Sequence, residues 1–405
     1  MSDPIDRMLD AAEAGKSIIK NRDILHFTYI PNTIQHRDSE QEKVTQSLLP
    51  ILKQSRPSNL LVYGKPGTGK TLVVKKVISK IQDRVEKSKF PIKLVYSNSK
   101  EETTIMGFLV SLGRQLGLEE SELPTTGLAI SEVFKRILTN IIEQNLNVIF
   151  VIDEIDNLAK LDLKTGYDIL YQLTRANERL KHGSLTLVGI SNDLRFKEKL
   201  DPRVISSLGE EEVVFMNYNV EQIKKILEER INEAFIENSV EEPTLNLCAA
   251  LAGGEHGDAR RAIDLIRVAG EIAERQQSDK VTTKHVREAS QKIEEDKETA
   301  SIESFPLHEK LVVIAIMKGN ISSAGDSSIG EIYSLYKNFC KKIGRDELKQ
   351  RRVIQMLSEI ELSGIISGRM IYQGSHGRSK KYKLLITSDM IKKIFKDELT
   401  LKDIL

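Results

Sequence analysis

The feature that most restricts the fold of this chain is the octapeptide GKPGTGKT at residues 64–71, which matches the pattern GxxxxGK[ST] in full. It follows a short apolar run at residues 59–63 and precedes a helical pattern. Glycines at such a junction let successive backbone N–H groups point at phosphate oxygens, and the helix N-terminus adds partial positive charge. The sequence therefore predicts a phosphate-binding loop of Gly64, Lys65, Pro66, Gly67, Thr68, Gly69, Lys70 and Thr71.

Two pairs of residues carry the chemistry that this loop predicts. We expect Lys70 to reach the β- and γ-phosphates of ATP or ADP and the Thr71 hydroxyl to bind Mg²⁺. A second apolar run ends in Asp153-Glu154. We predict that Asp153 joins the Mg²⁺ shell and that Glu154 polarises the attacking water. Without the phosphate loop upstream, an acidic strand-to-helix turn would explain this pair equally well.

A third polar strand end adds one more candidate. Asn192 closes the apolar segment at residues 184–192, where its amide could hold the attacking water beside Glu154. The alternative is an asparagine that only forms the turn after a strand.

Apolar runs alternate with helical patterns from residue 38 to residue 218. Strands that are apolar almost throughout are typical of a parallel sheet covered on both faces. Residues 219–293 show helical patterns only, so an α-helical region should follow the α/β region. The expected strands cover residues 59–63, 92–98, 147–156, 184–192 and 211–218.

The last hundred residues have a different pattern. Residues 294–303, EEDKETASIE, are charged and small, and we predict that they form a linker. Three helical patterns and then two strands around a Gly-rich turn follow, which is the order of a winged helix. These helices should cover residues 307–320, 328–344 and 347–364, and the hairpin residues 365–385.

Charge is unevenly distributed although the net charge is only +1. Residues 301–405 contain 18 Lys and Arg against 12 Asp and Glu, whereas the first 300 residues contain 42 against 47. A basic end on an acidic body suggests an anionic partner, although a basic solvated face gives the same count.

The cations of the basic end gather at the start of the third predicted helix and in the hairpin. N-terminal residues of a recognition helix reach base edges or phosphates, and a small basic hairpin tip can enter a minor groove. The alternative for the hairpin is a solvated turn. The predicted DNA contacts are Lys349, Gln350, Arg351, Arg352, Arg369, Arg378, Lys380 and Lys381.

No stretch of the chain approaches the ~18 apolar residues of a membrane span. The N-terminus also lacks the apolar core of a signal peptide. We therefore expect a cytoplasmic, nucleoid-associated protein without a membrane partner.

The order of these motifs resembles that of the AAA+ superfamily of ATPases. The resemblance implies an α/β P-loop AAA+ core with a parallel sheet, an α-helical lid and a C-terminal winged-helix domain. It also implies that Arg260 of the segment GDARRA contacts the γ-phosphate, with Arg261 as second choice, and that Arg203 is an arginine finger for a neighbouring subunit. The expected parts are an arm (1–25), the core (26–217), the lid (218–296) and the winged helix (303–405).

More narrowly, the chain resembles archaeal initiators related to the eukaryotic origin recognition complex and to cell division control protein six. The resemblance rests on segments such as RDILHFTYIPNTIQHRDSE, VIDEID and GDARRAIDLIRVAGEIAE. It implies that His36 and Arg37 lie near the adenine and that Tyr218 and Arg230 contact the nucleotide. It further implies that residues 123–136 touch DNA, with Thr125, Thr126 and Lys135 as the candidates.

The function expected from this resemblance is ATP-dependent binding of duplex DNA at a replication origin, with slow, switch-like hydrolysis. Paralogous initiators and the replicative helicase would be further partners. Two alternatives stay open: a DNA motor of the branch-migration type, and a signalling ATPase whose winged helix binds a protein.

Overall fold

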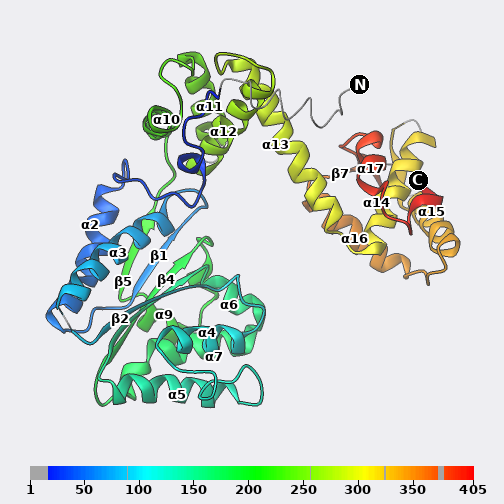
Figure 1. Ribbon diagram of the computed structural model, residues 1–405. Helices are drawn as coiled ribbons and strands as arrows, with labels where there is room; N and C mark the ends of the chain where they lie inside the picture. The colour runs from blue at the N-terminus through cyan, green and yellow to red at the C-terminus, as the bar shows by residue number, and fades with distance from the viewer. Residues whose placement is uncertain (1–16, 89, 256, 323–324, 373–377) are drawn as a thin grey trace, which may run out of the picture. The chain divides into compact units, whose positions relative to one another are not determined.

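The computed structural model describes residues 17–88, 90–255, 257–322, 325–372 and 378–405. The chain forms two compact units, of residues 1–287 and residues 288–405 (Figure 1). Among the helices of the described stretches, none is both long and apolar enough to cross a bilayer.

The first unit is built around a five-stranded parallel sheet with the order β2-β3-β4-β1-β5. Both faces of the sheet are buried: Phe150 belongs to one hydrophobic core and its neighbour Val151 to the other. The predicted parallel sheet with two covered faces is therefore confirmed. The strands are β1 (Leu60–Gly64), β2 (Ile92–Asn98), β3 (Asn147–Asp153), β4 (Ser184–Ser191) and β5 (Glu211–Phe215).

Helices form a layer on each face of this sheet (Figure 1). The layer of α2 (Asp38–Leu48) and α3 (Lys70–Ser88) shares a core with Val62 and Val151. The other layer packs on Val148, Phe150 and Ile152 of β3. It consists of α4 (Ile105–Gln115), α5 (Ile130–Glu143), α6 (Asp156–Leu161), α7 (Leu163–Thr174), α8 (Phe196–Lys199) and α9 (Pro202–Leu208).

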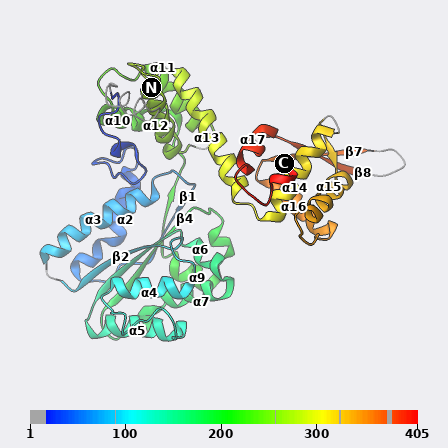
Figure 2. The ribbon, with the colours of Figure 1, turned by 45° about the vertical axis from the view of Figure 1, so that its right-hand side comes forward.

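A helical lid completes the first unit, as predicted for residues 219–293. Its first helix begins with a reciprocal cap between Asn219 and Gln222, which satisfies backbone N–H groups at the helix start. Figure 2 shows the segment before α2 running from these helices toward the sheet. The lid helices are α10 (Val220–Ala234), α11 (Glu242–Glu255), α12 (Ala259–Arg275) and the start of α13 (Thr283–Glu303).

Residues 294–303, predicted as a linker, are helical. Helix α13 continues through this segment to Glu303 without a break. The physical reason is that Glu, Lys and Ala are strong helix formers, and the segment contains neither Gly nor Pro to end the helix. Ile302 at its end is buried in the core of the second unit.

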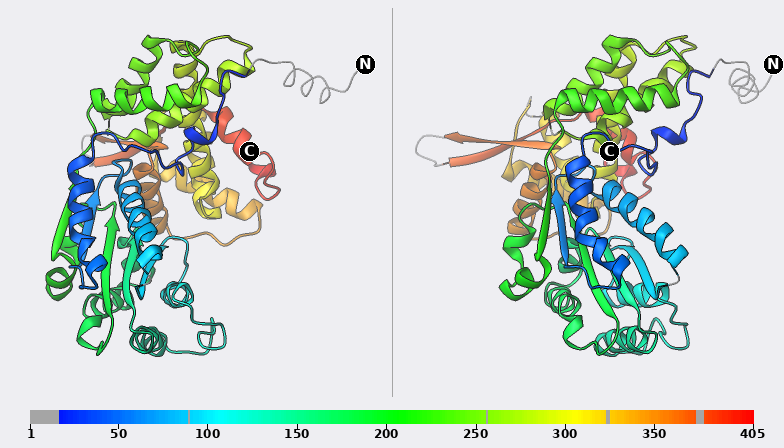
Figure 3. Two further views of the ribbon diagram at one scale, coloured as in Figure 1. Left: turned by 60° about the vertical axis from the view of Figure 1, so that its left-hand side comes forward. Right: turned by 90° about the vertical axis from the view of Figure 1, so that its left-hand side faces the viewer.

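The second unit is a winged helix, as predicted. Strands β7 (Ile366–Tyr372) and β8 (Arg378–Leu384) form an antiparallel ribbon (Figure 3). The short strand β6 (Ser327–Ser328) pairs with β8 and was not predicted, because two residues carry no periodicity. The helices are α14 (Leu307–Ser322), α15 (Ile329–Lys342), α16 (Gln350–Leu362) and the unpredicted α17 (Ser388–Phe395).

Candidate active site and nucleic-acid interface

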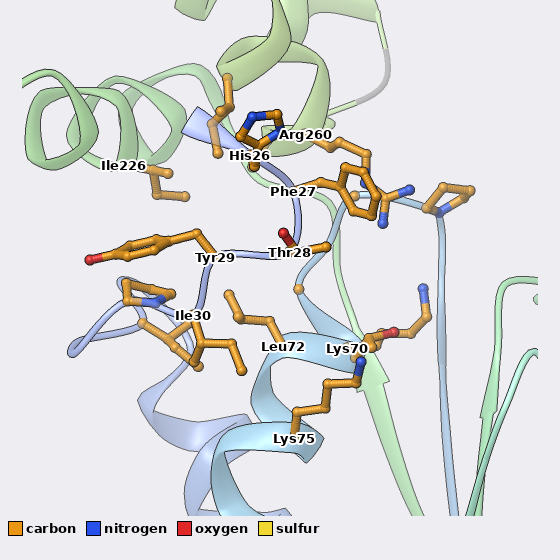
Figure 4. A pocket seen from close by; sticks show the side chains of 18 of the residues that line it. His26, Phe27, Thr28, Tyr29, Ile30, Lys70, Leu72, Lys75, Ile226 and Arg260 are labelled. Atoms are coloured by element: carbon orange, nitrogen blue, oxygen red, sulfur yellow. The ribbon is translucent and has the colours of Figure 1, made fainter. Parts of the chain in front are cut away.

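A cavity of about 500 Å³ lies in the first unit, between the ends of the strands and the lid. Its volume is in the range of small-molecule sites. Figure 4 shows Lys70 and Arg260 toward one end of this cavity, and Tyr29 and Ile226 toward the other. We call the end with Lys70 and Arg260 the charged end; the other end has aromatic and apolar groups, with Arg230 beside Tyr29.

The predicted phosphate loop joins β1 to α3 at the charged end. Gly67 and Gly69 have φ values of 72° and 92°, which only glycine adopts readily. Together with Pro66, Lys70 and Thr71 they line the cavity. Gly64 instead packs on Phe215, and the buried Thr68 hydroxyl donates to the Lys65 carbonyl at 2.8 Å, so these three residues shape the loop.

Lys70 is buried at the base of this loop. Its Nζ donates hydrogen bonds to the Gly64 carbonyl (2.9 Å), the Lys65 carbonyl (2.8 Å) and Asn192 Oδ1 (2.7 Å). Burial lowers the pKa of Lys70 to about 8. The predicted amide at the end of β4 is thus brought to the phosphate loop, where it holds the lysine.

Thr71 and Asp153 meet at the charged end, as their predicted role requires. The Thr71 hydroxyl and the Tyr96 hydroxyl both donate to Asp153 Oδ2, at 2.8 Å and 2.7 Å. A hydroxyl and a carboxylate oxygen are hard donors of the kind that Mg²⁺ takes, so the residues present fit this ion. Tyr96, which orients the carboxylate from β2, was not singled out from the sequence.

Glu154 follows Asp153 in an unusual backbone conformation. Its φ of 55° lies in the left-handed region, and Ser99 Oγ donates to its carbonyl at 2.6 Å. Its side chain pairs with Lys100, with 3.0 Å between Nζ and Oε1. A strained residue held this way is typical of functional sites. Glu154 and Asn192 both line the cavity.

The other end of the cavity is lined by residues 26–35, which sequence reasoning missed. Tyr29 of this segment donates to Glu233 Oε2 at 3.0 Å, and its ring lies 4.5 Å from the guanidinium carbon of Arg230. Figure 4 shows His26 to Ile30 facing Leu72 and Lys75 of α3. The aromatic and apolar composition of HFTYIP was the available signal, but the segment has no helical or strand periodicity.

Arg37 lies beside the phosphate loop rather than in the lining of the cavity. It is buried and donates to the Thr68 carbonyl (2.9 Å) and the Met216 carbonyl (2.6 Å). Its guanidinium stacks 3.9 Å from the centre of the Tyr218 ring, and Tyr218 does line the cavity. His36 precedes it with a φ of 57°. A contact of His36 and Arg37 with adenine stays a prediction.

The lid contributes Arg260 and Arg230 to the cavity. Arg260 lies at the N-terminus of α12, and its guanidinium carbon is 5.8 Å from the centre of the Phe27 ring. The capping residue Asp258 lies against Gly67, and the Ala259 N–H donates to the Gly67 carbonyl at 3.3 Å. The N-terminus of α12 is thus docked on the phosphate loop.

Arg203 lies at the start of α9, outside the lining of the cavity. Its exposed guanidinium is paired with Asp201 at 2.8 Å and lies 5.2 Å from the centre of the Tyr171 ring. This placement makes it accessible to another molecule. A role in the site of a neighbouring subunit stays a prediction.

The start of α16 forms an exposed group of polar and cationic residues. Lys349 is the N-cap, and Gln350, Arg351 and Arg352 make up the first turn. All four are exposed, and Arg352 has Glu359 at 3.7 Å. Cations at a helix N-terminus are not stabilised by the helix dipole, so their placement here is of no benefit to the helix itself.

The ribbon brings only some of the predicted wing cations to solvent. Arg369 is exposed and stands opposite Lys381 in the register. Lys380 is instead paired with Glu361 of α16 at 2.6 Å. Arg378 begins β8, but its side chain and residues 374–377 of the predicted tip (374–381) lie outside the described residues.

The third predicted contact region belongs to the first unit. Thr125 and Thr126 lie in the loop before α5, and Lys135 lies within that helix. All three are exposed, and Lys135 has Glu132 at 3.8 Å. The interior face of α5, including Phe134, is buried in the core.

Family models match three consecutive stretches of the chain. Residues 53–197 match an AAA domain, residues 224–291 the Cdc6 AAA+ ATPase-type lid domain, and residues 300–394 the CDC6 C-terminal winged helix domain.

Known proteins are similar to the chain over its whole length. The ORC1-type DNA replication protein of Cenarchaeum symbiosum is 63% identical over 403 residues, which cover 100% of this chain and 97% of that protein. A protein of the same name from Pyrococcus abyssi is 40% identical, with 99% and 95% covered. The solved structure of the Aeropyrum pernix ORC1 protein in complex with DNA is 36% identical, with a TM-score of 0.86 and coverages of 96% and 100%.

Proposed function

This chain belongs to the family of archaeal ORC1-type DNA replication proteins, and on that premise we propose that it binds duplex DNA at a replication origin under the control of bound ATP. The observation that carries the proposal is the presence, in one chain, of a complete phosphate site and an exposed cationic recognition helix. In this proposal residues 26–217 form the ATPase core, 218–296 the lid and 303–405 the DNA-binding winged helix.

At the nucleotide, each residue has a proposed task that follows from its position. Lys70 and the N–H groups of Gly67 to Thr71 hold the β- and γ-phosphates, and Arg260 contacts the γ-phosphate from the lid. Thr71 and Asp153 hold Mg²⁺, which neutralises charge on the phosphate oxygens when it is bound. Glu154 orients the attacking water once its carboxylate leaves Lys100, and Asn192 supports Lys70.

Hydrolysis in this arrangement should be slow. The Glu154 side chain is held by Lys100 at 3.0 Å, so the water-activating group is not free in this conformation. Because α12 touches the phosphate loop at Gly67, the γ-phosphate would bias the position of the lid. In this proposal, bound ATP controls the position of the lid, and rapid hydrolysis is not needed for that role.

At the DNA, the proposal assigns base and phosphate contacts to the first turn of α16 and phosphate contacts to Arg369, Arg378 and Lys381. The loop residues Thr125 and Thr126 would provide a further contact from the core. The complex of the Aeropyrum pernix relative with DNA supports the proposal that this chain binds DNA. Paralogous initiators and the replicative helicase are the proposed protein partners, at the nucleoid in the cytoplasm.

The deciding experiment is fluorescence anisotropy of short duplexes, with random and candidate origin sequences compared across a salt series. We expect tight binding with a site preference. The affinity should fall steeply as salt is added, because Lys and Arg side chains release counterions from the DNA phosphates when the protein binds. Fast DNA-stimulated turnover with ring assembly would instead support a branch-migration motor. Absence of DNA binding at low salt would refute the proposal and favour a signalling ATPase.

A further inference from the structure

Residues 17–25 are structurally part of the lid. Ile19 forms an antiparallel bridge with Phe235, and the Lys20 N–H donates to the Ala234 carbonyl at 2.9 Å. The Ile236 N–H donates back to the Ile18 carbonyl at 3.0 Å. Ile18 and Ile19 are buried. The segment therefore adds backbone pairing and apolar contact to the end of α10.

The Glu274 carboxylate of α12 accepts hydrogen bonds from several donors of this segment. Glu274 Oε1 accepts from Ser17 Oγ (2.9 Å), the Ile18 N–H (2.9 Å) and the Ile19 N–H (3.0 Å). Its second oxygen accepts from Arg22. Burial opposes ionisation of this carboxyl, but these donors outweigh it and hold the pKa of Glu274 below its usual range.

The chain continues from this anchored segment directly into the wall of the cavity. Residues 26–35 line the cavity without regular secondary structure. On the lid side, Arg230 donates to the Ile24 carbonyl at 3.3 Å. On the core side, Lys76 donates to the Asn32 carbonyl and Ile34 is buried against α2 and α3. The wall is thus held at both ends and, in its middle, by the Tyr29 hydroxyl on Glu233.

We propose that Glu274 is a positioning residue for nucleotide binding: it fastens residues 17–25 to the lid and thereby places the wall of residues 26–35 around the nucleoside part of ATP or ADP. The inference rests on the proposed function. Tyr29 and Ile30 of the wall lie on the side of the cavity away from Lys70, where the nucleoside part of the ligand would lie, whereas Phe27 lies beside Arg260 (Figure 4). If this irregular segment is already ordered before the ligand binds, less conformational entropy is lost on binding, and the affinity is higher.

The test compares ADP with inorganic tripolyphosphate, which has phosphates but no nucleoside. Binding to the full-length protein is measured with a fluorescent ADP analogue and by competition with tripolyphosphate. Glu274→Ala should weaken ADP by about tenfold or more, because a group of hydrogen bonds to a charged acceptor is lost. Tripolyphosphate should bind as it does to the wild type. Trypsin should also cut faster after Lys20 and Arg22 in the variant.

Two further variants separate positioning from damage to the lid. Glu274→Gln keeps an oxygen that accepts from Ile18 and Ile19, so it should restore most of the ADP affinity. Glu271→Ala removes a carboxylate from the same helix that pairs with Arg267 at 2.8 Å, and it should leave both ligands unaffected.

The inference is overturned if Glu274→Ala binds ADP like the wild type, or if both ligands weaken together. Failure of the proposed function looks different, because the wild type would then bind no DNA in the anisotropy experiment. A wild type without affinity for ADP would refute the proposed function and the inference with it.

Discussion

The nucleotide cavity and the start of α16 use charge in opposite ways. In the cavity, Lys70 and Asp153 are buried and each has hydrogen-bond partners from two or three elements. At α16, Arg351 is exposed at the first turn of a helix. Burying a charge costs free energy unless hydrogen-bond partners are held in place around it. An exposed charge instead attracts a ligand of opposite charge and needs no such fixed partners. The first site is therefore built for one ligand group, and the second for a polyanion.

The largest effect is expected on ATP hydrolysis, from a change at Glu154. Glu154→Gln should slow ATP hydrolysis by about a hundredfold or more, because the amide cannot accept a proton from the attacking water. ADP affinity should stay near that of the wild type. Single-turnover hydrolysis and equilibrium binding measure the two quantities. A variant that hydrolyses normally would show that the fixed geometry around Glu154 serves another purpose.

The second expectation concerns pH and depends on burial of Lys70. Burial lowers the pKa of this lysine to about 8, so the proton is lost as pH rises through 8. ADP affinity should therefore fall above pH 8, by up to about tenfold per pH unit, as the cation facing the phosphates disappears. In the free protein the sign is opposite: between pH 8 and the usual lysine pKa the unfolded chain binds more protons, so folding stability rises with pH.

Titration of ADP binding from pH 7 to pH 10 measures this effect, with Lys70→Ala as the comparison. The variant should bind weakly and show a flat profile in this range. An equally steep profile in the variant would assign the titration to another group.

Substitutions at the exposed start of α16 should have a smaller effect, on DNA affinity, and this effect should depend on salt. Arg351→Ala should weaken DNA binding by about tenfold at low salt and reduce the slope of log affinity against log salt by about one. Arg84→Ala removes an exposed arginine of α3 and is the matched control. If the two variants behaved alike, the first turn of α16 would have no special place on the DNA.

The smallest effect is expected from the support of the recognition helix. The Leu348 N–H, two residues before α16, donates to the Tyr336 hydroxyl at 3.1 Å, and that hydroxyl lies 2.7 Å from His308 Nδ1. Tyr336→Phe should lower the local stability by about 1 kcal/mol and speed amide exchange of Leu348 about fivefold. Tyr333→Phe should affect this amide less, because Tyr333 bonds the Leu348 carbonyl. Unchanged exchange in Tyr336→Phe would rule out this support.

The fold could largely be predicted because its signals are local. The strand β3 is apolar between Asn147 and Asp153 and so fits a strand buried on both faces, and α16 begins at the expected cations. The helical conformation of residues 294–303 was not predicted, because charged and small residues are found in solvated helices as well as in loops.

Within the site, the residues of the phosphate loop and Asp153-Glu154 could be found because short motifs fix their spacing. The wall of residues 26–35 could not, since its contacts are distant in sequence. Tyr29 meets Glu233, and Ser17 meets Glu274, across more than two hundred residues. Tyr96 was missed because a tyrosine in an apolar strand looks like a core residue until its hydroxyl is seen on Asp153.

Gly67 is required by two surfaces at once. A Cβ added at this residue would lie 1.6 Å from Oδ1 of Asp258, so even a methyl group would act as a wedge between loop and lid. A related protein that no longer bound nucleotide would still need glycine at this position for the lid to contact the phosphate loop. Alanine at this position would clash with Asp258 and move the lid away from the loop. Gly67 is thus part of the phosphate loop and also part of the contact between this loop and the lid.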